Sequence, residues 1–312
     1  MRGNSDLRHA FLCVVNTVTE FSPAKINLFL AVTGRRADGF HDLLSLAAPL
    51  DFGDELVAEV RRREEAGGSQ FSLKCDVPEV PVDGSNLVLK AAEAFAAATG
   101  WKGGVDFKLT KRIPLGAGLG GGSSNAVATL RALNRISDAA MSEEKMTEIV
   151  ATLGSDCALF LKNAPVIMRG RGDRIAAPPQ AAAVRLQGRR VLLFKPGFAI
   201  STPWAYARMA ARGTDYVPAP EAEGRLQAWM RSSAPAEELP GNNMEGAAFE
   251  KFVALPVLVA KLRTEFGVNT HMSGSGSACF VLLRDDSVTA PIIARIRDCW
   301  GLPVFVRAAR LV

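Results

Sequence analysis

The chain has 312 residues and a mass of 33.3 kDa, and 48% of its residues are hydrophobic and 22% charged. A chain of this length predicts about two domains with a core large enough to fold without disulfides or metals. The composition excludes a disordered or fibrous chain, and no apolar run approaches the roughly 18 residues of a membrane span, so we expect no membrane association.

The net charge of +5 is small for this length, and the basic residues are spread along the chain. The one basic triplet, 61–63, is followed at once by Glu64 and Glu65, and aromatic residues make up only 7% of the chain. This pattern argues against nucleic-acid binding and fits an enzyme with anionic ligands at least as well.

The cysteines are odd in number, form no C-x-x-C pair and sit beside apolar neighbours: Cys13, Cys75, Cys157, Cys279 and Cys299. Such a pattern predicts free thiols in a reducing cytoplasm. The three histidines are far apart, which argues against a zinc site. Residues 1–20 lack the features of a signal peptide, so we expect a cytoplasmic protein with a disordered extension at 1–20.

In the first half of the chain the pattern changes repeatedly between strand and helix. Val105, Phe107 and Leu109 alternate with polar residues, which predicts a strand with one solvated face. Ser142 followed by two glutamates predicts a helix start, and Gly154 its end. The expected strands are 26–33, 55–60 and 105–110, and the expected helices are 86–100, 127–136 and 142–154.

The second half follows a loop at 178–180. The dipeptide Thr202-Pro203 predicts a helix start, because proline suits the first helical turn. The expected strands are 191–194, 279–283 and 303–309, the expected helices are 245–265 and 287–299, and the expected linkers are 213–223 and 232–243. Because strands and helices alternate irregularly and several strands have a polar face, the pattern favours an α+β fold over a doubly wound parallel sheet.

The most informative stretch is rich in glycine and immediately precedes the helix expected at 127–136; it comprises Pro114, Leu115, Gly116, Ala117, Gly118, Leu119, Gly120, Gly121, Gly122, Ser123 and Ser124. Glycines let main-chain amides approach a ligand closely, and a helix start adds unpaired N–H groups and a positive dipole end. Together these features predict a phosphate-binding loop.

Three interpretations of this loop compete. A Walker A loop requires Gly-Lys-Ser/Thr, whereas Gly122 is followed by Ser123. A dinucleotide fingerprint fits poorly, because the preceding strand alternates and Asp138 falls at a helix end. A flexible turn without a ligand is the plain alternative, but such a turn rarely needs five glycines in seven residues.

The glycine loop resembles that of the GHMP kinases, the superfamily of galactokinase, homoserine kinase and mevalonate kinase. Residues 23–28 (PAKINL) and 38–41 (DGFH) resemble the amino-terminal signature of one branch, and residues 273–277 (SGSGS) match its late glycine motif. The resemblance covers about residues 22 to 283. It implies an α+β fold of two domains, 21–177 and 178–312, with the active site in the cleft between them.

The resemblance implies ATP-dependent phosphorylation of the 2-hydroxyl of 4-diphosphocytidyl-2-C-methyl-D-erythritol. It makes Asp156 the base that takes the hydroxyl proton, and Lys25 the cation that orients Asp156 and offsets charge on the moving phosphoryl group. On position alone, Asp156 could instead be a helix N-cap, and Lys25 a lysine extending from a strand end into solvent.

The same resemblance supplies the other expected site residues. Those expected to bind the cytidine diphosphate alcohol are Asn27, Phe40, His41, Thr202 and Tyr206; Phe40 stacks on cytosine, His41 reads its edge and Tyr206 forms the opposite wall. Asn86 and Lys111 are expected near the adenine of ATP, and Ser123 or Ser124 is expected to contact Mg²⁺.

Two positions depart from the family pattern: Ala158 stands where proline is frequent, and Asn243 where aspartate is usual. The rival functions are another GHMP kinase, of the homoserine or mevalonate type, and a non-catalytic sensor of ATP and a small molecule. A monomer and a homodimer are both compatible with the sequence.

Overall fold

The computed structural model describes residues 16–61, 69–239 and 241–312 of the chain. Its strands are β1 (Thr17–Arg35), β2 (His41–Val60), β3 (Phe71–Cys75), β4 (Val105–Thr110), β5 (Val166–Gly170), β6 (Arg174–Ala176), β7 (Arg190–Lys195), β8 (Thr270–Met272), β9 (Cys279–Leu283) and β10 (Phe305–Arg310). Its helices are α1 (Leu87–Thr99), α2 (Gly121–Ile136), α3 (Glu143–Leu153), α4 (Cys157–Lys162), α5 (Gln180–Leu186), α6 (Thr202–Arg212), α7 (Ala219–Arg231), the 3₁₀ helix η2 (Ala236–Glu238), α8 (Glu245–Lys251), α9 (Ala254–Phe266) and α10 (Thr289–Trp300).

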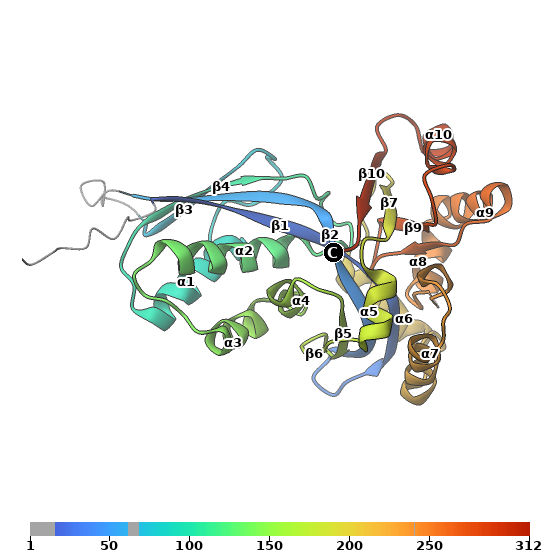
Figure 1. Ribbon diagram of the computed structural model, residues 1–312, viewed down its shortest axis with the longest axis horizontal. Helices are drawn as coiled ribbons and strands as arrows, with labels where there is room; N and C mark the ends of the chain where they lie inside the picture. Colours follow the sequence, from blue (N-terminus) through green and yellow to red (C-terminus); the bar gives the residue numbers. More distant parts are fainter. Residues whose placement is uncertain (1–15, 62–68, 240) are drawn as a thin grey trace, which may run out of the picture.

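The larger of two sheets is built on the long strand β2. Its order is β3-β4-β2-β5-β6, with β1 also paired to β2, and β3–β4 is its parallel pair. β2 pairs with β4 at residues 55–60 and with β5 at residues 43–47. One strand therefore runs from the helix-covered end of the molecule to the junction with the second sheet (Figure 1).

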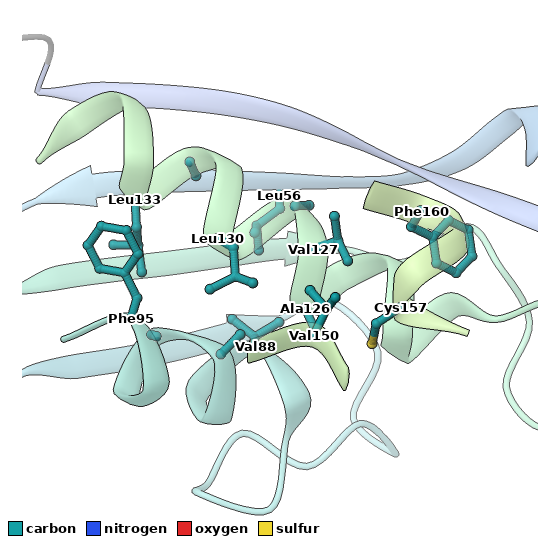
Figure 2. Packing of buried hydrophobic residues seen from close by; sticks show 14 of the residues in the cluster. Leu56, Val88, Phe95, Ala126, Val127, Leu130, Leu133, Val150, Cys157 and Phe160 are labelled. Carbon is teal, nitrogen blue, oxygen red and sulfur yellow. The ribbon is translucent and has the colours of Figure 1, made fainter. Parts of the chain in front are cut away.

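Helices α1 to α4 cover one face of this sheet (Figure 1). Side chains of α1 and α2 meet Leu56 of β2 in the core, where Phe95, Val127 and Leu130 are each at most 1% exposed. Figure 2 shows these side chains filling the layer between helices and strands. Removal of this apolar surface from water is the main force that fixes the helices on the sheet.

Local signals place the helix ends where the sequence predicts them. The side chain of Asn86 caps α1 by accepting from the Val88 N–H at 2.9 Å, and Gly100 ends it in a left-handed conformation. Ser142 caps α3 in the same way. Ser201 caps α6, whose first turn contains Pro203. Each cap satisfies a main-chain donor that the first helical turn leaves unpaired.

The smaller sheet is antiparallel, in the order β10-β7-β9-β8, and α6, α8, α9 and α10 pack around it. Its edge strand meets the middle of β2: the Val312 N–H donates to the Pro49 carbonyl at 3.0 Å, and the Arg310 N–H to Asp51 at 2.7 Å. The C-terminus consequently lies at the junction of the two sheets (Figure 1).

The mixed arrangement confirms the predicted α+β class. The larger sheet ends at β6 and the smaller begins at β7, on either side of the boundary expected at 177/178; the domain division itself stays a prediction. The extension expected at 1–20 is wrong for Thr17–Glu20, which begin β1, and its residues 1–15 lie outside the described residues.

Several element predictions require correction. The strands expected at 26–33 and 55–60 are parts of β1 and β2, which are 19 and 20 residues long. The linker expected at 213–223 already contains the start of α7, and the linker at 232–243 contains η2. Among the described residues, none of the helices combines the length and the apolar character that a bilayer crossing requires.

Candidate active site

The glycine loop connects β4 to α2 and is hydrogen-bonded on both sides. Toward β1, the Lys25 N–H donates to the Leu119 carbonyl at 3.0 Å. Toward the smaller sheet, the Ala278 N–H donates to the Ala117 carbonyl at 3.1 Å, and the Ser273 hydroxyl to the Gly118 carbonyl at 3.0 Å. The predicted loop thus lies between the early motif at residues 23–28 and the late motif at residues 273–277.

Gly118 shows why this loop requires glycine. Its φ is +74°, and a Cβ on it would lie 2.1 Å from the Ser273 carbonyl oxygen. That distance is far below a van der Waals contact, so any side chain would force the loop away from the 273–277 turn. The loop's amides and the N-terminus of α2 together form the concave, positively polarised surface that anions favour.

Lys25 and Asp156 face each other beside this loop. The Lys25 ammonium lies 3.4 Å from Asp156 Oδ2, and the two side chains are 4% and 31% exposed. Asp156 occupies the N-cap position of α4, but its side chain makes no capping hydrogen bond. Its carboxylate is therefore directed to the lysine and the cavity, and the capping alternative is wrong.

A short polar chain holds Lys25 in place. The ammonium donates to Asn27 Oδ1 at 2.6 Å, Asn27 Nδ2 donates to the Ser45 hydroxyl at 2.8 Å, and Ser45 donates to the Phe29 carbonyl at 2.7 Å. The β1–β2 register shifts between Pro23 and Lys25 and again after Asn27. Such bulges re-aim side chains, and here they bring both polar side chains to the cavity. Ser45 is a site residue that the sequence pattern did not reveal.

The cavity at this point has a volume of about 430 Å³. Of the residues expected there, it is lined by Lys25, Asn27, Lys111, Asp156, Thr202, Tyr206 and residues 114–123. Ser123 faces it, whereas Ser124 is 1% exposed and its hydroxyl accepts from Ser22 at 2.8 Å. Asn86 does not line it, because its amide is occupied at the start of α1 by Val88 and Pro81.

Lys111 has a buried partner that the sequence analysis missed. Its ammonium forms an ion pair with Asp54, which is fully buried. Asp54 also accepts from the main-chain N–H groups of Arg112 and Ile113 at 2.7 and 2.8 Å, and from Asn125 Nδ2 at 2.9 Å. This network anchors the segment that leads into the glycine loop.

A second cavity, of about 750 Å³, adjoins the first. Phe40 lines it from the turn between β1 and β2, His41 from the first position of β2, and Tyr206 from α6. His41 stacks on Tyr206 with ring centroids 4.7 Å apart, and its Nε2 lies 3.1 Å from the hydroxyl of Tyr216, which the sequence analysis did not single out. These expected base-binding side chains are brought together; the cytosine sandwich itself stays a prediction.

Burial sets the protonation of this aromatic cluster. It lowers the pKa of His41, with a smaller effect from Arg35, so the imidazole is neutral at pH 7. Burial, and to a lesser degree the charge of Asp156, raises the pKa of Tyr206 to about 12. Both rings are thus uncharged near neutrality, which suits the stacking and edge recognition of a neutral base.

The two departures from the family pattern have structural explanations. Asn243 accepts from the Val32 N–H at 2.8 Å and donates to the carbonyls of Val32 and Asp215, both at 2.9 Å. An ionised aspartate could not donate to those carbonyls, so the amide here joins β1 to the chain before α7. Ala158 is the second residue of α4, whose helix forms without a proline.

Comparison with known proteins agrees with this geometry. Residues 86–164 match the family described as "GHMP kinases N terminal domain". The chain is similar to the 4-diphosphocytidyl-2-C-methyl-D-erythritol kinase of Methylacidiphilum infernorum, with 38% identity over 271 residues and 86% of each chain covered. A crystal structure of 4-(cytidine 5'-diphospho)-2C-methyl-D-erythritol kinase superposes with a TM-score of 0.73 at 33% identity, covering 94% of this chain and 99% of that one.

A homoserine kinase from Cytophaga hutchinsonii superposes with a TM-score of 0.69 at 17% identity and covers 95% of both chains, which shows a shared fold. The class is that of the GHMP kinases, small-molecule phosphotransferases that use ATP as phosphate donor. Identity of 38% over most of the chain narrows the class further. The chain belongs to the family of 4-diphosphocytidyl-2-C-methyl-D-erythritol kinases.

Proposed function

We propose that the chain transfers the γ-phosphoryl group of ATP to the 2-hydroxyl of 4-diphosphocytidyl-2-C-methyl-D-erythritol, a step of non-mevalonate isoprenoid precursor biosynthesis. The observation that carries the proposal is the 3.4 Å approach of Lys25 to Asp156 in the cavity lined by the glycine loop. Phosphoryl transfer requires alignment and charge stabilisation more than covalent chemistry, and these groups provide both. The names of the relatives support the choice of substrate.

Each group has one role in the step. The main-chain N–H groups of residues 115–122 hold the ATP phosphates, and Asp156 accepts the proton of the acceptor hydroxyl as the hydroxyl oxygen attacks the γ-phosphorus. The bond from the γ-phosphorus to the oxygen bridging it to the β-phosphorus breaks, and ADP leaves. The Lys25 ammonium lowers the energy of the negative charge on the transferred group. Asn27 fixes the position of that ammonium.

The donor set near the loop fits Mg²⁺. The Asp156 carboxylate and the Ser123 hydroxyl line the same cavity, and Mg²⁺ is commonly held by one or two carboxylates together with substrate phosphates. Within the described ranges no group of three or more His, Cys, Asp and Glu side chains gathers, which is unlike a dedicated protein cage for a metal. When bound, Mg²⁺ would offset the negative charge of the ATP phosphates.

The second cavity takes the cytidine end of the substrate. Phe40 is 50% exposed and offers a ring face for stacking, while His41 presents a neutral imidazole to the edge of the base. Thr202 and Tyr206 line both cavities, so they contact the part of the substrate between base and alcohol.

A direct assay tests the proposal. Purified protein is incubated with Mg-ATP and, in separate reactions, with 4-diphosphocytidyl-2-C-methyl-D-erythritol, homoserine or mevalonate, and ADP release is followed. We expect turnover with the cytidine alcohol alone. Preference for homoserine or mevalonate would make the chain a different GHMP kinase. If no ADP is released with any of the three alcohols, the non-catalytic sensor is favoured.

Phe40→Ala tests the base site. Stacking on an aromatic side chain is worth about 1–3 kcal/mol per base, so the KM for the cytidine substrate should rise by about 5- to 150-fold with little change in kcat. Phe21→Ala is the matched control, because Phe21 is 49% exposed and lines neither cavity. Equal kinetics of the two variants would contradict a base site at Phe40.

A further inference from the structure

The two cavities share five lining residues: Leu43, Ser155, Arg171, Thr202 and Tyr206. Four of these are uncharged at neutral pH. Among the charged side chains, Lys25, Lys111 and Asp156 line only the first cavity, where the phosphoryl group is transferred. Arg35 lines only the second cavity, where the base binds. Among the described residues, Arg171 is therefore the one permanent charge that borders both cavities.

The turn between β5 and β6 fixes the main chain of Arg171. Its N–H donates to Asp173 Oδ1 at 2.9 Å, and the N–H of Gly172 donates to the Arg169 carbonyl at 3.1 Å. Gly170 and Gly172 have φ values of +66° and +98°, which the tight turn requires. The side chain thus starts from a rigid point beside both cavities.

The guanidinium of Arg171 lies over the ring of Phe40, with its central carbon 3.8 Å from the ring centroid. A cation–π contact is not a hydrogen bond, so it uses none of the guanidinium N–H donors. Nε is buried and has no hydrogen-bond partner, and no carboxylate in the described part of the chain forms an ion pair with Arg171. A buried donor without a partner marks a place where a ligand acceptor would gain a hydrogen bond.

We infer that Arg171 binds the diphosphate of the substrate, an inference that rests on the proposed function. With the base at Phe40 and His41 and the acceptor hydroxyl at Asp156, the diphosphate must cross the boundary between the cavities. A guanidinium is planar, always charged and able to donate two parallel hydrogen bonds to phosphate oxygens. Arg171 therefore selects alcohols that carry a nucleoside diphosphate, and aligns the alcohol with Asp156.

Binding measurements with cytidine, CMP and CDP test this role, because the three probes share the base and differ in phosphate. Arg171→Gln should leave the cytidine dissociation constant within about twofold, raise that of CMP modestly and raise that of CDP by about 10- to 100-fold. Arg171→Lys keeps the positive charge but lacks the planar pair of N–H donors, so it should raise the dissociation constant of CDP less than Arg171→Gln does. In turnover, Arg171→Gln should raise the KM for the cytidine alcohol and leave the KM for ATP unchanged.

Arg174→Gln is the matched control, since Arg174 lies in the same hairpin, is exposed and lines neither cavity. Equal weakening of all three probes in Arg171→Gln would overturn the inference and make Arg171 a support for the Phe40 ring. Unchanged binding of CDP would also overturn it. Thermal unfolding of each variant checks that the hairpin is intact.

The turnover assay of the wild-type protein tests the proposed function separately from the role of Arg171. If wild-type protein does not phosphorylate the cytidine alcohol, the substrate assignment is wrong whatever the binding constants are. If wild-type protein does so, and Arg171→Gln binds CDP as tightly as wild type, the role of Arg171 alone is refuted.

Discussion

The two ends of the candidate site are built differently. At the transfer end, Lys25 is almost fully buried, and its ammonium has partners in Asn27 and Asp156. At the base end, Phe40 lies half-exposed in a hairpin turn, and its ring contact is Arg171 of another turn. Phosphoryl transfer tolerates little misplacement of the reacting atoms, whereas stacking on a base tolerates small shifts.

This difference separates the effects expected from substitutions. At the transfer end a substitution abolishes phosphoryl transfer or lowers the stability of the fold, because the buried polar side chains there are hydrogen-bonded or ion-paired to one another. At the base end a change weakens substrate binding and leaves the chemical step intact. A base-end variant with low kcat and normal KM, or a transfer-end variant with the reverse, would contradict the division.

The largest effect is expected for Asp156→Asn. An amide cannot accept the hydroxyl proton, so kcat should fall by about 10²- to 10⁴-fold, while binding of ATP and of the alcohol persists. Steady-state kinetics and equilibrium binding of both ligands measure the two parts separately. Asp298→Asn, on the exposed surface of α10, is the control and should retain full activity. An undiminished kcat in Asp156→Asn would refute its role as base.

Asp54→Asn is expected to weaken the fold. The substitution leaves the Lys111 ammonium buried without a counter-charge, which typically costs about 3–5 kcal/mol of unfolding free energy. Urea denaturation measures this loss. Asp106→Asn is the control, because Asp106 is 49% exposed in its ion pair with Arg61, and such pairs contribute at most about 1 kcal/mol. Similar small losses in both variants would show that the buried network is not an anchor of the loop.

The smallest effect concerns pH. Because burial lowers the pKa of His41, the imidazole stays neutral until the pH falls below about 6.5 and accepts a proton only beneath that range. Protonation removes one ring acceptor, so the KM for the cytidine alcohol should rise about fivefold there, the worth of one hydrogen bond. The folded state also binds this proton less readily than the unfolded chain, so stability falls as the pH drops through this range.

His41→Gln should flatten this KM profile, since glutamine does not titrate. The KM for ATP serves as the internal control and should not follow the same curve. A wild-type profile that stays flat down to pH 5 would exclude recognition of the base by the imidazole.

Local signals were strong enough to predict much of the fold. Asn86, Ser142 and Gly154 mark helix ends through main-chain contacts within a few residues, and the alternation at 105–110 predicts β4. The first part of β2 was missed, because residues 44–50 are buried on both faces and lack alternation, and Pro49 reads as a break.

The residues of the candidate site also differ in how far the sequence predicts them. The glycine loop and Lys25 stand in local motifs, so sequence alone reveals them. Asp54, Arg171 and Tyr216 carry no motif, and their partners Lys111, Phe40 and His41 are far away in the chain. Only the folded chain shows such pairs. Asn86 and Ser124 show that a residue expected at the site can also have a structural contact, since the side chain of each accepts a hydrogen bond within the fold; their contacts with ATP and Mg²⁺ stay predictions.

The main-chain bonds of the glycine loop have a mechanical consequence. The carbonyl of Leu119 accepts a hydrogen bond from Lys25 in β1, and the carbonyl of Ala117 accepts one from Ala278 just before β9. One short segment therefore joins the larger sheet to the smaller. Any hinge motion that parted the sheets would have to break this seam. The floor of the cavity lined by the glycine loop is therefore fixed to both sheets at once.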